Sequence, residues 1–324
     1  MSGLLSQLNR MSLALSDSLT DDDLDVLDIR RVDDLSPANV LDFGIDRVGT
    51  IEAGMLLTGI CAGGLLDVRV TGQFSDPLPV PVVEVVTDQP LLACMAAQYA
   101  GWPFALDDYF AICSGPARIA RGKEELLKEF DLITETINVV GVFETAQLPE
   151  ASHVAAFAEQ CGHGIENVTL CIARTASLPG TIQVIARSVE ATLHKLHEID
   201  FDLCTIKRGF GRAPLAPVGA DDLSALGRTN DAILYGATVN LWIDADDETL
   251  ASVGPKVPSC SSSDFGTPFI ETFEKYDRDF FKIDKMLFSP ARVVMHSLRS
   301  GNLFSFGEIR PDILSASFGV QPPE

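Results

Sequence analysis

Arg187 and Glu190 lie three residues apart in the stretch TIQVIARSVEATLHKLHEI, which runs from Thr181 to Ile199. At about 100° per residue, apolar side chains gather on one side of a helix, and Arg187, Glu190 and His194 fall on the other. The ordinary interpretation is an ion pair in water, which contributes only ~0.3–0.5 kcal/mol. The chemical interpretation is that a carboxylate held beside a guanidinium stays ionised, which suits a cationic substrate and the activation of water.

The residues before this pair favour the chemical interpretation. TASLPG, at residues 175–180, combines Pro and Gly and predicts a tight turn immediately before the helix. Side chains in the first helical turns would therefore lie at the lip of any cleft at that point.

A second group of segments mixes Gly and Pro with polar side chains. In CSGPARIARG (113–122), Arg118 follows the turn residues Ser114-Gly115-Pro116, where a guanidinium would hold a phosphate or a carboxylate in a bidentate fork. A plain turn is the alternative, because Gly and Pro punctuate every fold.

Two later regions carry side chains that can bond the polar edge of a ring. They are GFGRAPLAPVG with ALGRTNDAILYG (209–219 and 225–236) and VPSCSSSDFGTPFIETF (257–273), with Arg212, Thr229, Asn230, Asp231, Ser262 and Asp264. Asn230-Asp231 fits a helix cap equally well, so cap and ligand contact both stay open. The Ser-, Pro- and Gly-rich run from Lys256 to Pro268 predicts a long ordered loop.

Metal and nucleotide motifs are absent from the sequence. Glu190, His194 and His197 share one helical face, as metal ligands could. The other histidines of the chain lie in no comparable motif, so a solvated polar face is the better interpretation. G-x-G-x-x-G, P-loop, G-x-S-x-G and C-x-x-C patterns do not occur. We therefore expect neither a metal nor a cofactor.

Composition limits the class of protein. The chain has 324 residues and a formal net charge of −22, which argues against a nucleic-acid partner. No apolar run approaches the ~20 residues that span a bilayer, and no signal peptide is evident at the N-terminus. Seven scattered cysteines fit free thiols in a reducing compartment. These features predict a cytoplasmic protein without a membrane segment.

Strand-like and helix-like segments alternate along the chain, which predicts an α/β fold with α+β mixed layers. The expected strands lie at residues 40–45, 68–72, 79–87, 137–144, 167–174 and 237–244. The expected helices lie at residues 90–100, 123–131, 152–162, 188–199 and 222–233, with an amphipathic helix near the N-terminus. We expect a first domain at residues 1–165 and a second at 166–324, with a chain that can cross between them.

Eight stretches taken together resemble one family, the methenyltetrahydromethanopterin cyclohydrolases. They follow family order from about residue 40 to residue 305: AGMLLTGICAGGL, LLACMAAQYAGW, SGPAR, the TAS…G…Q…R..E pattern from Thr175 to Glu190, GRAPLAP, GRTNDAILYG, VPSC…D.G.PF.E.F and DFFKID..LFSPA. The likeness is strongest to the bacterial branch, which oxidises formaldehyde through this pterin.

The resemblance implies a function in one-carbon metabolism and methylotrophy. Water would add to the cationic 5,10-methenyl-tetrahydromethanopterin, and the ring would open to the N5-formyl compound. Glu190 would act as base and then as acid, with Arg187 as its orienting partner. It also implies a cytoplasmic homotrimer of subunits with two α/β domains flanking a substrate cleft, neither Rossmann nor P-loop. The pterin is then the substrate, and no cofactor is required.

The resemblance also places substrate contacts. They are expected at Ser114, Gly115, Arg118, Thr175, Ser177, Gln183, Arg212, Thr229, Asn230, Asp231 and Asp264. Because the substrate tail carries phosphate and carboxylates, Arg118, Arg212 and Arg228 are the candidates for holding it.

The chain departs from the family pattern at three places. Ser263 replaces an arginine, Ala216 replaces a serine, and CMAAQ in place of CLGSQ puts Ala96 and Ala97 where the family has Gly and Ser. These changes leave two alternatives open. One is a catalytically altered paralogue that binds a reduced pterin without turnover, and the other is a structural oligomer with the ion pair on its surface.

Overall fold

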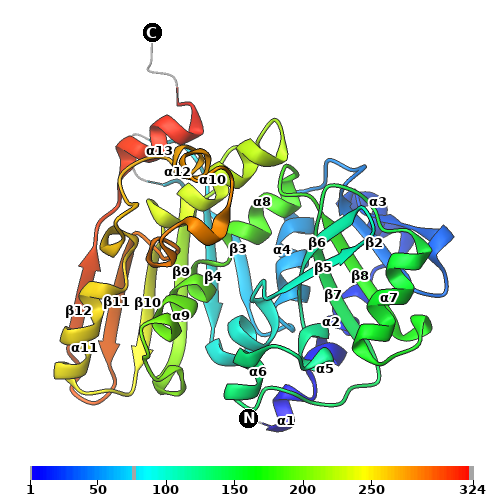
Figure 1. Ribbon diagram of the computed structural model, residues 1–324, viewed down its shortest axis with the longest axis horizontal. Coiled ribbons are helices and arrows are strands. Elements are labelled where there is room, and N and C mark those ends of the chain that lie inside the picture. The colour runs from blue at the N-terminus through cyan, green and yellow to red at the C-terminus, as the bar shows by residue number, and fades with distance from the viewer. Residues whose placement is uncertain (1, 75–77, 321–324) are drawn as a thin grey trace. The chain divides into compact units, whose positions relative to one another are not determined.

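The computed structural model describes residues 2–74 and 78–320, and the chain forms two compact units. Unit 1 comprises Met1–Asp67 and Leu92–Gln183, and unit 2 comprises Val68–Leu91 and Val184–Glu324. Each unit contains a six-stranded mixed sheet with helices packed on it, which confirms the predicted α/β class (Figure 1). The boundary expected after residue 165 falls inside unit 1, just before a strand that pairs within the sheet of that unit.

The sheet of unit 1 has the order β1-β2-β8-β7-β6-β5. Its strands are β1 (Arg30–Arg31), β2 (Asn39–Gly44), β5 (Trp102–Leu106), β6 (Tyr109–Ser114), β7 (Val139–Glu144) and β8 (Val168–Ala173). β8 is parallel to both β2 and β7, and the other pairs are antiparallel. The carboxyl ends of β2, β8 and β7 therefore meet at one edge of the sheet.

Helices cover both faces of this sheet. The helices of this part of the chain are α1 (Ser2–Leu5), α2 (Leu8–Asp17), α3 (Asp21–Leu27), α4 (Ile51–Cys61), the π-helix η2 (Leu91–Gln98), α5 (Ala117–Arg121), α6 (Glu125–Glu129), α7 (Ala151–Cys161) and α8 (Leu178–Ile185), the last of which runs into unit 2. Leu57 of α4 packs in one core cluster with Val140 and Val142, whereas Phe157 of α7 packs in another with Phe143. Alternate residues of the central strands thus face α4 and α7.

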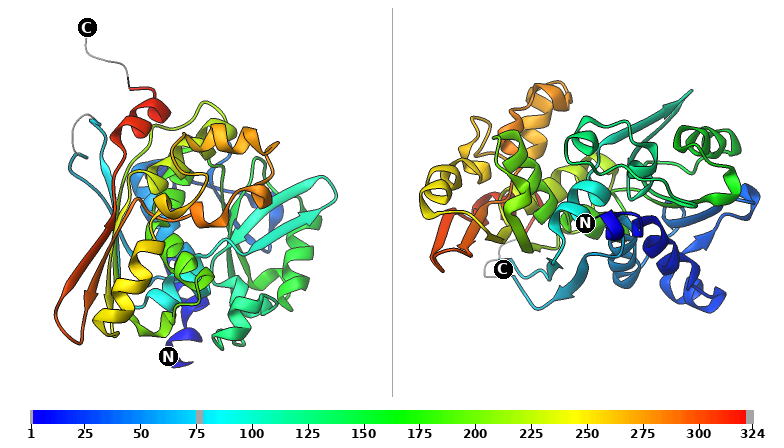
Figure 2. Two further views of the ribbon diagram at one scale, coloured as in Figure 1. Left: turned by 60° about the vertical axis from the view of Figure 1, so that its left-hand side comes forward. Right: turned by 90° about the horizontal axis from the view of Figure 1, so that it is seen from below.

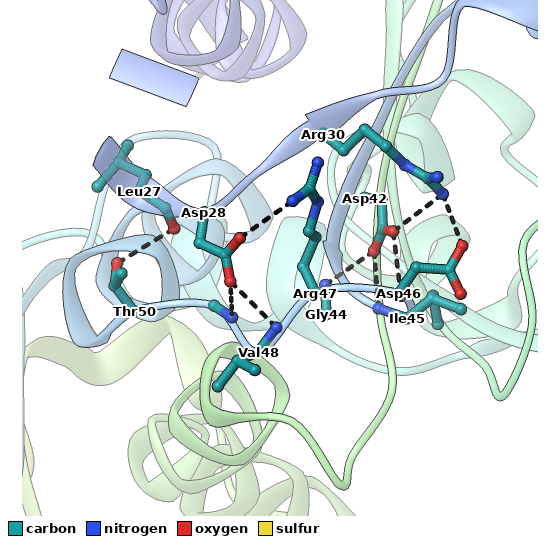
Figure 3. Close-up of polar contacts among 11 residues, drawn as sticks. Leu27, Asp28, Arg30, Asp42, Gly44, Ile45, Asp46, Arg47, Val48 and Thr50 are labelled. Atoms are coloured by element: carbon teal, nitrogen blue, oxygen red, sulfur yellow. Dashed lines mark hydrogen bonds and ion pairs between the residues drawn. The ribbon is translucent and has the colours of Figure 1, made fainter. Parts of the chain in front are cut away.

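Two aspartates shape the connection from β2 to α4 (Figure 3). Asp42 is fully buried and accepts hydrogen bonds from the backbone N–H groups of Gly44 (2.9 Å), Ile45 (2.7 Å) and Asp46 (3.1 Å). Asp28 accepts the N–H groups of Val48 (3.1 Å) and Gly49 (3.0 Å). The backbone N–H groups of this loop donate to these two carboxylates, so the loop is held in one conformation.

The sheet of unit 2 has the order β12-β11-β10-β9-β4-β3. Its strands are β3 (Asp67–Thr71), β4 (Val82–Thr87), β9 (Ile206–Pro214), β10 (Thr238–Ile243), β11 (Arg292–Ser297) and β12 (Leu303–Gly307). Its helices are α9 (Ser188–Glu198), α10 (Asp222–Leu234), α11 (Asp247–Val253), α12 (Phe269–Lys275) and α13 (Pro311–Phe318). Green α9 and yellow α11 lie on the same side of this sheet (Figure 2).

All six predicted strands and all five predicted helices are present, with ends shifted by a few residues. One prediction is wrong in detail. The stretch from Thr181 to Ile199 is not one helix, because the chain turns at Ala186-Arg187 between α8 and α9. No helix in the described part of the chain has the length and apolar character needed to cross a membrane.

Candidate active site

Arg187 and Glu190 lie at the beginning of α9 in unit 2. Arg187 is the residue at the N-cap position, its backbone N–H donates to Val184 O (3.1 Å), and its carbonyl accepts from Ala191 N–H (2.8 Å). Glu190 is in the first helical turn, where the positive end of the helix dipole favours a carboxylate. Arg187 Nη1 and Glu190 Oε2 are 3.8 Å apart.

Burial excludes the surface ion pair. Arg187 and Glu190 are each only 7% exposed. A pair removed from water loses hydration that its Coulomb attraction repays only in part, so it is weak evidence for stability. Charged groups kept in such a setting are candidates for function. The burial therefore favours the chemical interpretation of this pair.

Two glycines of β9 bring α9 close to the sheet. A Cβ atom on Gly211 would lie 2.3 Å from Ser188 Oγ, and one on Gly209 would lie 2.8 Å from Val189 Cγ1. Ser188 and Val189 are the first two residues of α9. The GFG segment, which the sequence analysis placed in a ring-binding region, is thus part of a strand. Because its two glycines have no side chains, α9 can approach the sheet, and this approach sets the position of Glu190.

Lys195 is a buried residue of α9 that the sequence analysis missed. Its Nζ donates to Ser261 Oγ (3.1 Å) and to the carbonyl of Met286. Burial lowers the pKa of Lys195 to about 8. The segment 256–268 is ordered as predicted, and this lysine ties it to α9. The signal was weak, because at about 100° per residue Lys195 lies only at the edge of the apolar stripe, next to Thr192.

In unit 1, Ser114 and Gln183 meet at one thiol. Cys61 Sγ lies 3.2 Å from Ser114 Oγ, and Gln183 Nε2 donates to the same sulfur at 3.4 Å. Gly115 has φ +93° and donates its N–H to Ala97 O (2.8 Å). A Cβ there would lie 3.0 Å from Val140 O, so only glycine fits this turn without strain.

Thr175 and Ser177 lie in the turn that leads into α8. Ser177 Oγ donates to Arg174 O (2.8 Å) and accepts from Gly180 N–H (3.1 Å), so it caps the helix. Thr175 Oγ1 donates to Glu144 Oε1. Glu144 is a second residue that the sequence analysis missed as a site residue, although it is the last residue of the predicted strand INVVGVFE.

Arg118 was expected to hold the anionic tail of the substrate, but its side chain is bonded to other groups inside unit 1. The residue is fully buried in unit 1, and its Nε donates to Glu124 Oε1 at 2.9 Å. Its Nη1 donates to the carbonyls of Met95 (3.0 Å), Ala96 (3.2 Å) and Ala97 (3.3 Å), at the end of η2. Its guanidinium satisfies those orphan carbonyls, so the structure favours a structural role over a contact with the substrate tail.

Thr229, Asn230 and Asp231 lie inside α10 and do not cap it. Thr229 Oγ1 donates to Ala225 O (2.9 Å), and Asn230 Nδ2 donates to Leu226 O (2.9 Å). Asp231 Oδ1 instead accepts the N–H of Phe269 (2.7 Å), the first residue of α12. Burial raises the pKa of Asp231 to about 7. The cap interpretation is therefore wrong for α10 and applies to α12.

Asp264 organises the loop before α12. It accepts from Lys275 Nζ (3.0 Å), Tyr276 Oη (2.8 Å) and Asp284 N–H (2.9 Å). Burial acts to raise the pKa of Asp264, but the Asp284 N–H and the two side-chain donors hold it below its ordinary value.

The two remaining arginine candidates differ in exposure. Arg212 lies on β9 and is exposed. Arg228 directs its guanidinium at backbone carbonyls, namely Ser317 O (3.3 Å), Val218 O (3.1 Å) and Pro217 O (3.5 Å). Arg212 is thus the one of the three tail candidates whose charge faces solvent.

Within the described ranges, no group of three or more His, Cys, Asp and Glu side chains has the geometry of a metal site. His194 Nε2 lies 3.8 Å from Glu198 Oε1 on the same helix, as in a polar helical face. A hollow of about 500 Å³ in unit 1 is lined by residues of 133–136 and 161–163, and none of the expected site residues lines it.

A profile described as cyclohydrolase (MCH) matches residues 7–318. The chain belongs to this family. The match covers both units and includes Arg187 and Glu190.

Curated family members of similar length resemble the whole chain. A methenyltetrahydromethanopterin cyclohydrolase of Rhodopirellula baltica is 44% identical over 88% of this chain and 87% of its own length. One of Methanococcoides burtonii is 39% identical over 97% of this chain and 98% of its own length. One of Xanthobacter autotrophicus is 42% identical over 87% of this chain and 84% of its own length. Bacterial and archaeal relatives thus carry the same name.

Proposed function

We propose that this chain hydrolyses 5,10-methenyl-tetrahydromethanopterin to the N5-formyl form. The single observation that carries the proposal is the buried Arg187–Glu190 pair, 3.8 Å apart at the start of α9, in a member of this family. A methenyl carbon between two nitrogens is electrophilic and positively charged. It needs an ordered water and a proton acceptor, which a buried carboxylate supplies.

Glu190 takes one proton as the oxygen of water bonds to the methenyl carbon. The resulting carbinolamine collapses when the bond from carbon to N10 breaks, and Glu190 returns its proton to N10. The hydroxyl proton leaves to solvent, so each turnover releases one proton. Arg187 orients the carboxylate and keeps it ionised between the two transfers. The pterin is the substrate, and no step draws on a metal or a further cofactor.

The departures from the family pattern bear on the choice between turnover and binding alone. Ala96 and Ala97 are fully buried, and their carbonyls accept from Arg118, so both contribute backbone groups to η2. Ser263 lies in the loop around Asp284, with its N–H 3.1 Å from Asp284 Oδ2. Ala216 is buried, just after β9. None of these four substitutions adjoins the Arg187–Glu190 pair in sequence or removes one of its groups, which favours turnover over the paralogue that only binds a reduced pterin.

The direct test follows the methenyl absorbance. Purified protein is mixed with 5,10-methenyl-tetrahydromethanopterin, and the loss of absorbance is compared with the uncatalysed rate, with the formyl product identified by mass. Saturable acceleration supports the proposal. Binding of the substrate without acceleration contradicts it and leaves the altered paralogue.

We further propose a homotrimer in the cytoplasm, acting in one-carbon metabolism during formaldehyde oxidation. This rests on the likeness to bacterial and archaeal members of the family.

A further inference from the structure

Glu144 ends the central strand β7 on the face of the unit 1 sheet where α4 packs. Val142 and Val140, two and four residues earlier, belong to the α4 core cluster, and side chains of a strand alternate between faces. Glu144 lies opposite Ile112 of β6 and Ala173 of β8 in the register. It therefore stands at the carboxyl edge of parallel strands, where α/β sheets commonly bind ligands.

The Glu144 carboxylate is half-buried and partly used. Its Oε1 accepts the hydroxyl of Thr175, which is 6% exposed and whose own carbonyl accepts Thr181 Oγ1 (3.0 Å). Thr175 is therefore fixed and in turn fixes the carboxylate. An ionised carboxylate has about four acceptor sites, and Thr175 takes one of them. The group is positioned to accept further hydrogen bonds.

An apolar surface continues from Glu144 onto the neighbouring hairpin. Pro103, Ala105, Phe110 and Ile112 of β5 and β6 share the face of Glu144, because the alternate residues of both strands lie buried against α7. Phe110 is 55% exposed, and its carbonyl accepts Thr145 Oγ1 (2.7 Å), which ties the hairpin to the end of β7. An exposed aromatic ring thus lies in the strand next to a preorganised carboxylate.

We propose that Glu144 binds the amino-pyrimidinone edge of a reduced pterin, with the ring packed against Phe110 and Ile112. This edge presents two adjacent N–H donors, which match the two oxygens of a carboxylate as the fork of an arginine does. The flat ring beside it matches the apolar surface. The inference takes its substrate class from the proposed function. The residues it concerns lie in unit 1 and do not include Arg187 or Glu190, which belong to unit 2.

The experiment compares Glu144→Gln with Glu159→Gln, an exposed glutamate on α7 of the same unit. The amide keeps the shape of Glu144 and an acceptor for Thr175, but it sets an NH₂ group against the ring donors. We expect the KM for the methenyl pterin to rise by roughly 10- to 100-fold, the value of a hydrogen bond to a charged group. The kcat should stay within a few-fold, and Glu159→Gln should change neither constant.

Binding of 6-methyltetrahydropterin, which has the ring without the tail, separates the two proposals. Calorimetry on the wild type and both variants should show the same weakening in Glu144→Gln alone. If the wild type binds this ring through Glu144 but does not hydrolyse the methenyl compound, the proposed function fails and the inference stands. If the wild type turns over and both variants keep its KM, the inference fails and the function stands.

Phe110→Ala provides a second variant, since an exposed ring can be removed without opening the core. It should raise the KM and weaken 6-methyltetrahydropterin binding in the same direction as Glu144→Gln. Should Glu144→Gln fail to fold, unchanged constants in Phe110→Ala would overturn the inference by themselves.

Discussion

Buried ionisable side chains distinguish this chain at the residue scale. The side chains of Glu190 and Arg187 are almost fully buried. Lys195 on the same helix and Asp231 in α10 are fully buried. Desolvation disfavours the charged form of each such group, so partners must offset it. For Asp231 the partners are the backbone N–H of Phe269, at the start of α12, and the side chain of Ser317. Its charge state is therefore coupled to stability.

Asp231→Asn should change stability in a pH-dependent way. The pKa of Asp231 is raised to about 7 in the folded chain and has an ordinary value of 3.8 otherwise. The contribution of Asp231 to the free energy of unfolding is thus fully present below pH 3.8 and is lost as the pH rises through about 7. The neutral amide keeps the acceptor for Phe269 N–H, so the variant should gain on the order of a few kcal/mol over the wild type at pH 8.

The free energies of unfolding of the wild type and of Asp231→Asn are measured by urea unfolding at pH 5 and pH 8. The difference in unfolding free energy between variant and wild type should grow from the lower to the higher pH. An equal difference at both values would show that Asp231 does not carry a raised pKa.

The polar loop between β2 and α4 is the clearest positioning device at the element scale. Asp42 alone satisfies three consecutive backbone donors that have left the sheet (Figure 3). Asp46, in the same loop, has a side chain that is 58% exposed and bonds Arg30 at 2.7 Å. These two aspartates form a matched pair, one structural and one on the surface.

Asp42→Ala should destabilise the protein by roughly 3 kcal/mol or more, because three N–H groups lose a buried acceptor. Asp46→Ala should cost about 0–1 kcal/mol, the usual value of an exposed ion pair. The urea midpoints of both variants test this, and equal midpoints would contradict the assigned role of Asp42.

Gly211→Ala tests how β9 positions α9. The added Cβ would lie 2.3 Å from Ser188 Oγ and 3.0 Å from Val85 Cγ2, so the Ser188 side chain and the first turn of α9 that carries it must shift away from β9, unless rotation of Ser188 alone makes room. We expect a loss of ~1–3 kcal/mol of stability. We also expect kcat to fall by roughly 10²-fold, as for a catalytic group displaced by about 1 Å.

Gly3→Ala is the control, because nothing lies within 4 Å of a Cβ at that position. It should leave kcat and the unfolding free energy unchanged. A fully active Gly211→Ala would show that the approach of α9 to β9 does not set the position of Glu190.

The sequence predicted interior elements well because their patterns are local. Apolar runs such as VVGVF gave β7, and spaced apolar side chains gave α7 and α10. β9 was missed, since GFG resembles a loop until the helix that needs the glycines is known. The turn at Ala186-Arg187 was missed because it contains neither Gly nor Pro.

The same limit applies to the site. Arg187 and Glu190 are close in the chain, so their spacing alone suggested the pair. Glu144 needed the register that sets it beside Ile112, and Cys61 is joined to Gln183 across 122 positions. Arg118 had the right residue type, but its burial and its carbonyl partners are tertiary features that no local pattern contains.

Charge matters at the scale of the whole molecule. The chain carries a formal net charge of −22, yet large apolar side chains such as Val48 and Leu303 are 78% and 58% exposed. Single exposed apolar side chains are common on protein surfaces, so the charge is the feature that bears on association. Salt screens the repulsion between acidic subunits, so higher ionic strength should favour assembly.

The proposed homotrimer predicts a mass of about 105 kDa, three times the 34.9 kDa of one chain. Light scattering after size-exclusion chromatography should give this mass at 0.5 M salt, and any dissociation should appear first at 0.05 M salt. A 34.9 kDa species at every concentration would contradict the trimer without touching the catalytic proposal.

The most direct measurement of the central claim compares Glu190→Gln with Glu198→Gln on the same helix. Glu198 pairs with Lys285 and His194 and has no part in the proposed chemistry. Removing the proton-transfer group at Glu190 should lower kcat for methenyl hydrolysis by roughly 10²–10⁴-fold while KM stays within a few-fold. Glu198→Gln should retain wild-type kcat. A Glu190→Gln protein as active as its control would contradict the account.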